Sequence, residues 1–134
     1  SGAVRGVPAD LAHWRPAPGR KSIWELTLHT AYWKYAVPRN LEPQPIPRFP
    51  RSPANWPAAP GRPDPSQWEA DRRLLVEEHA RFSEAVARFD PARLRRRPAP
   101  KRKWTYGQLI IGVLAHDAYH AGQIQMLKRL WGTR

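Results

Sequence analysis

The stretch LIIGVLAHDAYHAGQIQMLKRL, residues 109–130, determines how this chain folds, because it is long, largely apolar and contains two histidines four residues apart. Residues at this spacing on an α-helix point in the same direction, since one turn takes 3.6 residues. His116 and His120 therefore share the face that also carries Leu109, Val113 and Leu127, and we expect this face to be buried. Burying two imidazoles is costly unless both rings find partners, and a divalent metal ion is the commonest such partner.

The size and composition of the chain indicate one folded unit. Its 134 residues suffice for one hydrophobic core, so we expect a single domain over residues 1–134. Seven tryptophans and 41% hydrophobic residues argue against disorder, despite sixteen prolines. The absence of cysteine excludes disulfides, zinc–thiolate sites and a protein thiol nucleophile. We find no signal peptide and no apolar segment of the ~18 residues that span a membrane, and we expect a cytoplasmic protein.

The formal net charge of +12 has two explanations. Lysine and arginine bind phosphates, so nucleic acid is one possible partner. An arginine-rich composition without any such function is the explanation we favour, since eighteen of the 23 basic residues are arginine. The basic residues of a predicted exposed loop would form the nucleic-acid interface, but no aromatic residues alternate with them. These residues are Arg93, Arg95, Arg96, Arg97, Lys101, Arg102 and Lys103.

Three start signals predict long helices over residues 22–36, 65–89 and 105–131. Each signal provides a side chain that caps the free amides of a first helical turn, and two of them form a capping box. No segment has the alternating pattern of a β-strand. The capping residues are Ser22 with Glu25, Asp64 before Pro65, and Thr105 with Gln108.

The connection between the first two long helices is unusual. It contains ten prolines from Pro38 to Pro65, so we expect Pro38 to end the first helix and the connection to be non-helical. A connection this long can cross over along the helices or form a lid, and it lets the flanking helices lie parallel. Trp56 in this segment is a candidate lid residue, although simple packing is the interpretation we favour. The residues before Ser22 are too poor in apolar residues for a full helix.

A zinc-type centre needs a third protein ligand besides the histidine pair. His29 lies at the edge of the apolar face of helix 22–36, and His79 lies between apolar residues of helix 65–89. Helical periodicity alone does not choose between them. Three neutral imidazoles would leave a metal ion its full charge, which acidifies bound water or attracts an anionic substrate.

The histidine pair also resembles the zinc-protease motif His-Glu-x-x-His, but the match is poor. Asp117 replaces the glutamate that acts as general base, and no third histidine follows along the helix. We therefore set the protease interpretation aside. Tyr119 and Gln123 lie beside the histidine face and are candidates for a pocket next to the site.

Two segments, SIWELTLHTAYW at 22–33 and HDAYHAGQI at 116–124, resemble the DinB-like (DNA-damage-inducible) superfamily, which also includes thiol-dependent transferases and maleylpyruvate isomerases. The resemblance implies an all-α four-helix bundle of up-down-down-up topology, with a long connection between its second and third helices. Its first helix would be largely absent from this chain. The family's metal ligands would fall on His29, His116 and His120, which leaves His79 as a core or pocket-lining residue.

The resemblance also implies a function. We expect a metal-dependent enzyme of the thiol S-transferase or hydrolase type, with Zn²⁺ or Ni²⁺ as the favoured ion and Fe²⁺ or Mn²⁺ as alternatives. Its partners would be a small-molecule electrophile and a low-molecular-weight thiol. The competing hypotheses are a basic nucleic-acid-binding protein and a bundle that keeps a metal for stability alone.

The last helix predicts one further partner, a second copy of the chain. Opposite its histidines the helix carries a stripe of small and medium apolar residues, which one small bundle seldom buries by itself. The alternative is that the stripe packs against the other helices of the same bundle. The resemblance adds weight, since the family commonly forms dimers. The stripe consists of Ile111, Leu114, Ala118, Ala121 and Gly122.

Overall fold

The structure, a computed structural model, describes residues 2–41 and 45–134. These residues form helices and loops without a strand, as the all-α expectation requires. The three long helices begin and end within one residue of their predicted bounds. In chain order the elements are η1 (Gly2–Val4), α1 (Ala9–His13), α2 (Ile23–Ala36), α3 (Pro38–Leu41), α4 (Pro65–Arg88), η2 (Pro91–Arg93) and α5 (Tyr106–Trp131).

The predicted caps start all three long helices. In α2 the amide of Glu25 donates to Ser22 Oγ at 3.2 Å, and the amide of Ser22 donates to the Glu25 carboxylate at 2.9 Å. The carboxylate of Asp64 accepts two amide hydrogen bonds at the start of α4. Thr105 and Gln108 form a second capping box at the start of α5. Each cap satisfies amides that have no partner within the helix.

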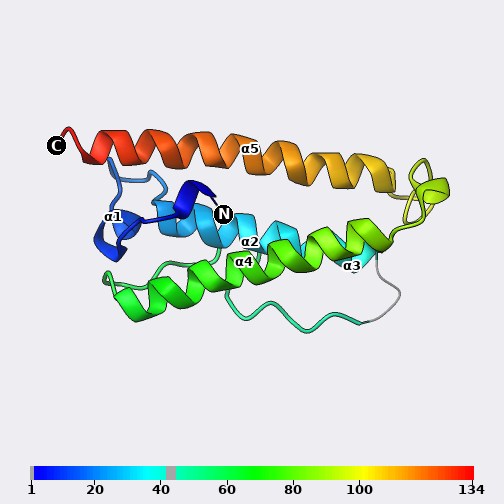
Figure 1. Cartoon of the computed structure of the whole chain (residues 1–134), viewed down its shortest axis with the longest axis horizontal. Coiled ribbons are helices and arrows are strands. Elements are labelled where there is room, and N and C mark those ends of the chain that lie inside the picture. Colours follow the sequence, from blue (N-terminus) through cyan, green and yellow to red (C-terminus); the bar gives the residue numbers. More distant parts are fainter. Residues whose placement is uncertain (1, 42–44) are drawn as a thin grey trace.

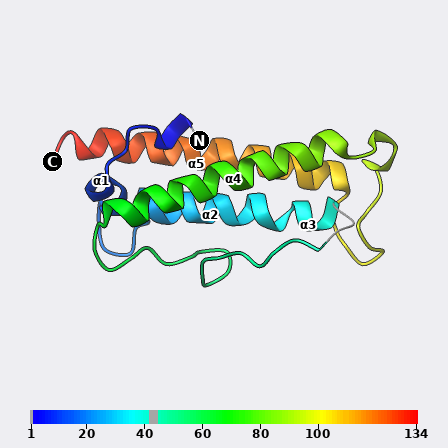
Figure 2. The same cartoon turned by 60° about the horizontal axis from the view of Figure 1, so that its bottom comes forward.

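The long helices pack side by side around α2 (Figure 1). Helices α2 and α4 run in the same direction, and α5 runs in the opposite one. α2 contacts both of the other long helices and is buried on nearly all sides. The connection that follows α3 returns along α2 to the start of α4 (Figure 2), which is what allows these two helices to be parallel.

Two details of the connecting segments differ from the sequence prediction. Residues 38–41 form the short helix α3, although we expected no helix after Pro38. Proline fits the first turn of a helix, because its fixed φ is helical and the amide it lacks has no partner there. Residues 45–64 are non-helical as predicted, and Pro43 lies outside the described residues. Within the basic loop, Arg93 ends the short helix η2.

The residues before α2 form only the short helices η1 and α1 in the described part of the chain, in agreement with their low apolar content. Buried hydrogen bonds fix this region against α4, and α4 against α2. The indole of Trp68 donates to the carbonyl of Val7 at 2.6 Å. The indole of Trp24 donates to Asp71 at 2.7 Å, and Arg51 forms an ion pair with the other oxygen of that carboxylate. These bonds satisfy polar groups that would otherwise be costly to bury.

Candidate metal centre

His29 from α2 meets His116 and His120 from α5, and the three form a histidine cluster (His29, His116 and His120). Nε2 of His116 lies 2.9 Å from Nε2 of His29 and 3.0 Å from Nε2 of His120. One ligand atom from each ring lies within 4.8 Å of the other two. Nitrogen ligands that bind one ion at about 2.0–2.1 Å lie roughly 3 Å apart, so this spacing suits a shared metal ion.

Hydrogen bonds at the outer nitrogens set the protonation of two rings. Nδ1 of His29 donates to the backbone carbonyl of Asn55 at 2.5 Å, and Nδ1 of His120 donates to Oε1 of Gln123 at 2.6 Å. Because carbonyl oxygens only accept, each of these Nδ1 atoms holds the ring's proton. The Nε2 atoms of both rings therefore direct lone pairs toward His116, which is the tautomer that metal ligands require.

His116 lies between those two lone pairs and is the least satisfied ring of the cluster. Its Nδ1 atom is buried and has no hydrogen-bond partner among the described residues. The pKa of His116 is lowered to about 4, mainly by burial and in addition by the neighbouring His120, His29 and Lys34. Burial also lowers the pKa of His29, against the opposing hydrogen bond to Asn55. His116 and His29 are thus neutral at pH 7 and able to bind a cation.

The proline-rich connection supplies one side of the cluster. Trp56 stacks on His29 with ring centroids 3.7 Å apart and an angle of 5° between the rings. Asn55 has a φ of 68°, in the left-handed region that asparagine tolerates better than most residues. Its side chain accepts a hydrogen bond from the Trp33 indole at 2.9 Å. Trp56 therefore packs as expected, but it packs on the site, and sequence analysis missed Asn55 altogether.

A cavity of about 600 Å³, which we call the His120 cavity, opens beside the cluster. Tyr119 and Gln123, the candidates for a pocket next to the site, are among the residues that line it. The Gln123 amide donates to the Tyr119 hydroxyl at 3.4 Å, which links the two. The complete lining is Pro16, Ala17, Gly19, Arg20, Lys21, Leu26, Trp56, Tyr119, His120, Gln123, Met126 and Leu127.

His79 is a correction to the sequence prediction. It is exposed on α4, lies outside the histidine cluster and lines neither cavity found among the described residues. The buried residues of α4 include Leu75, Glu78 and Phe82, which belong to the narrow strip of this helix that packs against α2. His79 falls just beyond that strip, because each residue is rotated by about 100° from its predecessor.

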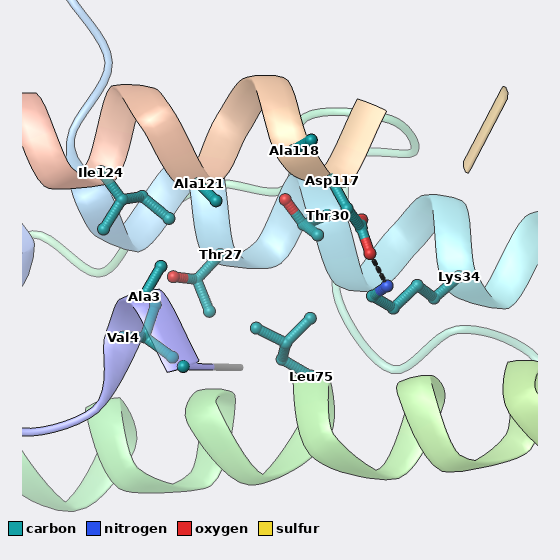
Figure 3. Close-up of a pocket in the computed structure, with 11 residues that line it drawn as sticks. Ala3, Val4, Thr27, Thr30, Lys34, Leu75, Asp117, Ala118, Ala121 and Ile124 are labelled. Carbon is teal, nitrogen blue, oxygen red and sulfur yellow. Dashed lines mark hydrogen bonds and ion pairs between the residues drawn. The ribbon is translucent and has the colours of Figure 1, made fainter. Parts of the chain in front are cut away.

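A second cavity of about 280 Å³, the Lys34 cavity, lies between α2, α4 and α5 (Figure 3). Lys34 from α2 and Asp117 from α5 form an ion pair across it. The Lys34 side chain is only 2% exposed, and its burial lowers its pKa to about 8. The other Asp117 oxygen, Oδ1, is buried without a hydrogen-bond partner among the described residues. Ala118 and Ala121, both of which we assigned to the apolar stripe of α5, line this cavity.

Comparison with known proteins identifies the family. The family model described as the DinB superfamily matches residues 1–124. No curated protein and no solved structure shows a significant match to the chain. Among the described residues, no helix combines the length and the apolar character needed to cross a membrane.

Proposed function

The chain belongs to the DinB superfamily, and on this premise we propose that it is a metal-dependent enzyme whose ion is bound by His29, His116 and His120. The observation that carries the proposal is the convergence of the three Nε2 atoms, with the protons of His29 and His120 held at Nδ1. Imidazole ligands suit Zn²⁺ and Ni²⁺, which are the ions we favour, and Fe²⁺ and Mn²⁺ come next.

The surrounding residues have distinct roles in this proposal. The carbonyl of Asn55 and the amide of Gln123 fix the orientation of two ligand rings, and Trp56 shields His29. Tyr119 and Gln123 face the His120 cavity, where their hydroxyl and amide groups can hydrogen-bond a substrate. When bound, the ion would act as a Lewis acid that lowers the pKa of a thiol or water at its open side.

We assign the reaction to the thiol S-transferase or hydrolase type. The chain contains no cysteine, so the thiol of a transfer reaction has to come from a small cosubstrate. The His120 cavity, at about 600 Å³, falls within the range of small-molecule sites. The competing hypothesis is that the metal only stabilises the fold. It does not require a substrate in the His120 cavity.

A screen of untagged protein tests the enzymatic proposal. Low-molecular-weight thiols are combined with simple electrophiles, and thioether formation is followed before and after dialysis against a chelator. We expect turnover that is lost with the metal and returns when Zn²⁺ or Ni²⁺ is added back. If chelation lowers the melting temperature while no thiol or ester substrate turns over, the metal is structural and the enzymatic proposal fails.

We also propose that α2, α4 and α5 correspond to the second, third and fourth helices of the up-down-down-up bundle. The parallel pair α2 and α4 and the reversed direction of α5 support this correspondence (Figures 1 and 2). The long connection between α3 and α4 supports it as well, because parallel neighbours require a crossover.

The exposed face of α5 supports a homodimer, which we propose as the assembly state. Ile111 and Leu114 are 66% and 53% exposed, an unfavourable environment for large apolar side chains. Ala118 and Gly122 on the same exposed side would let a second α5 approach closely. Sedimentation should give twice the mass of the chain, and Leu114→Glu should give the single mass. A wild-type protein that sediments as a monomer at every concentration contradicts the dimer.

A further inference from the structure

We propose that the His120 cavity binds the carboxylate of a substrate that also has an apolar body, and that Arg20 and Lys21 hold this carboxylate. The proposal rests on the proposed function, since it names the class of molecule that would reach the histidine cluster. The three histidines do not indicate which substrate reaches them, and this proposal specifies the charge and the shape of that substrate.

The first argument is the charge of the cavity lining. Two cationic side chains, Arg20 and Lys21, line the cavity, and none of its lining residues is acidic. The acidic group that approaches it is Glu25, which pairs with Arg15 at 2.9 Å and with Lys21 at 3.2 Å and also caps α2. The cavity wall thus has a net positive charge.

Arg20 is the stronger of the two anion-binding candidates. None of the ion pairs found within residues 2–41 and 45–134 includes it. A guanidinium group offers parallel N–H donors that match the two oxygens of a carboxylate. The backbone also fixes the position of Arg20, because its amide donates to the carbonyl of Ala17 at 3.1 Å and Gly19 takes a φ of 74° in this turn.

The second argument is the distribution of apolar groups. Leu26, Trp56, Met126 and Leu127 line the same cavity as the cationic residues and His120. Lys21 Nζ lies 4.7 Å from the centroid of the Trp56 ring, and that ring stacks on His29. One continuous wall therefore leads from the cations to the histidine cluster. A ligand that fits has an anionic end at Arg20, an apolar middle on Trp56 and its other end at the cluster.

Calorimetric titration with a matched pair of ligands tests this proposal. The probes are 4-phenylbutyrate and its uncharged analogue 4-phenylbutanamide, each titrated into metal-free and Zn²⁺-loaded protein. We expect the carboxylate to bind at least about tenfold more tightly than the amide in both forms, the preference typical of a charge-assisted hydrogen bond. The metal-free form separates binding by Arg20 from direct binding of the carboxylate to the ion.

Two substitutions, each of which removes one positive charge, show which residue causes the preference for the carboxylate over the amide. Arg20→Gln should abolish most of it, and Lys21→Gln should reduce it. Arg97→Gln, which removes the same charge from the exposed loop before α5, should leave it unchanged. Circular dichroism melts establish that the variants are folded, and the exposure of both arginines predicts little change in melting temperature.

The proposal is overturned if wild type binds acid and amide equally or binds neither, or if the preference persists in Arg20→Gln. This failure is distinct from failure of the proposed function. Protein that binds Zn²⁺ without a carboxylate preference would overturn only the ligand assignment. Protein that binds no metal but keeps an Arg20-dependent preference would overturn only the metal-dependent function.

Discussion

The two cavities beside α5 differ in the environment of their positively charged side chains. In the His120 cavity, Arg20 lines an open space that has no acidic residue in its wall, and no ion pair among the described residues includes it. Lys21 also lines this space and is exposed, although it pairs with Glu25. In the Lys34 cavity, the lysine is buried and paired with Asp117 (Figure 3). A cationic side chain that loses its hydration on burial needs an anionic partner from the protein. A cationic side chain that stays hydrated needs no such partner and is available to a ligand. The difference distinguishes charge that maintains the fold from charge that is available for binding.

One helix supplies both environments through adjacent residues. His116 and Asp117 are consecutive, so their side chains leave α5 about 100° apart. His116 joins the histidine cluster, while Asp117 forms an ion pair with Lys34 of α2 (Figure 3). A variant at either residue should therefore act mainly on its own cavity, with a smaller electrostatic effect on the other, since Lys34 also lowers the pKa of His116.

The largest effect should come from Asp117→Asn, which leaves Lys34 buried without its counter-ion. We expect a loss of about 1.4 kcal/mol in the free energy of unfolding at pH 7, because a lysine whose pKa is about 8 loses its proton at roughly this cost rather than stay charged without a counter-ion. Urea denaturation measures it, and zinc affinity should change little. The double variant Lys34→Met/Asp117→Leu should recover most of the loss, and equal losses in both variants would refute the charge explanation.

An intermediate effect should follow from Trp56→Ala, which removes the ring that shields and orients His29. We expect zinc affinity to fall about tenfold, as is usual when a group that supports a metal ligand is lost. Competition with a chromogenic chelator provides the measurement. Trp104→Ala, at a half-exposed tryptophan in the loop before α5, is the matched control and should leave the affinity unchanged. An equal loss in both variants would show that Trp56 has no specific role.

The smallest effect should be a pH dependence that originates in Lys34. Burial lowers its pKa to about 8, so between pH 8 and 10.5 the unfolded chain holds this proton more tightly than the folded chain. The free energy of unfolding should therefore increase as the pH rises through this window, and this gain should be absent below pH 8. Relative to Lys34→Met, wild type should gain roughly 1 kcal/mol between pH 7.5 and about 8.8 in urea denaturation. A constant or shrinking difference would contradict the lowered pKa.

Local signals in the sequence were sufficient for the helices and for the pair His116 and His120. Ser22, Asp64 and Thr105 cap the helices that they were predicted to start, because capping depends on residues within one turn. The spacing of His116 and His120 placed both on one face for the same local reason. The choice of His29 over His79 came from the family resemblance, and the geometry of the cluster agrees with it.

Contacts between distant segments could not be predicted from the sequence. Asn55 reaches His29 across the proline-rich connection, and Lys34 meets Asp117 from another helix. Neither pair has a periodic pattern, since both depend on how the segments pack. The position of Arg20 at the His120 cavity is a further example. The turn that contains Arg20 is local, but most of the other residues that line the cavity lie far along the chain.

The metal content of untagged protein tests the central claim most directly. Wild type, His116→Ala and His79→Ala are stripped with chelator, reloaded with Zn²⁺, separated from free ion and subjected to elemental analysis. The histidine cluster predicts about one ion per chain in wild type and in His79→Ala, and almost none in His116→Ala. A wild-type protein without zinc, or a His116→Ala variant that binds as much as wild type, would contradict the claim.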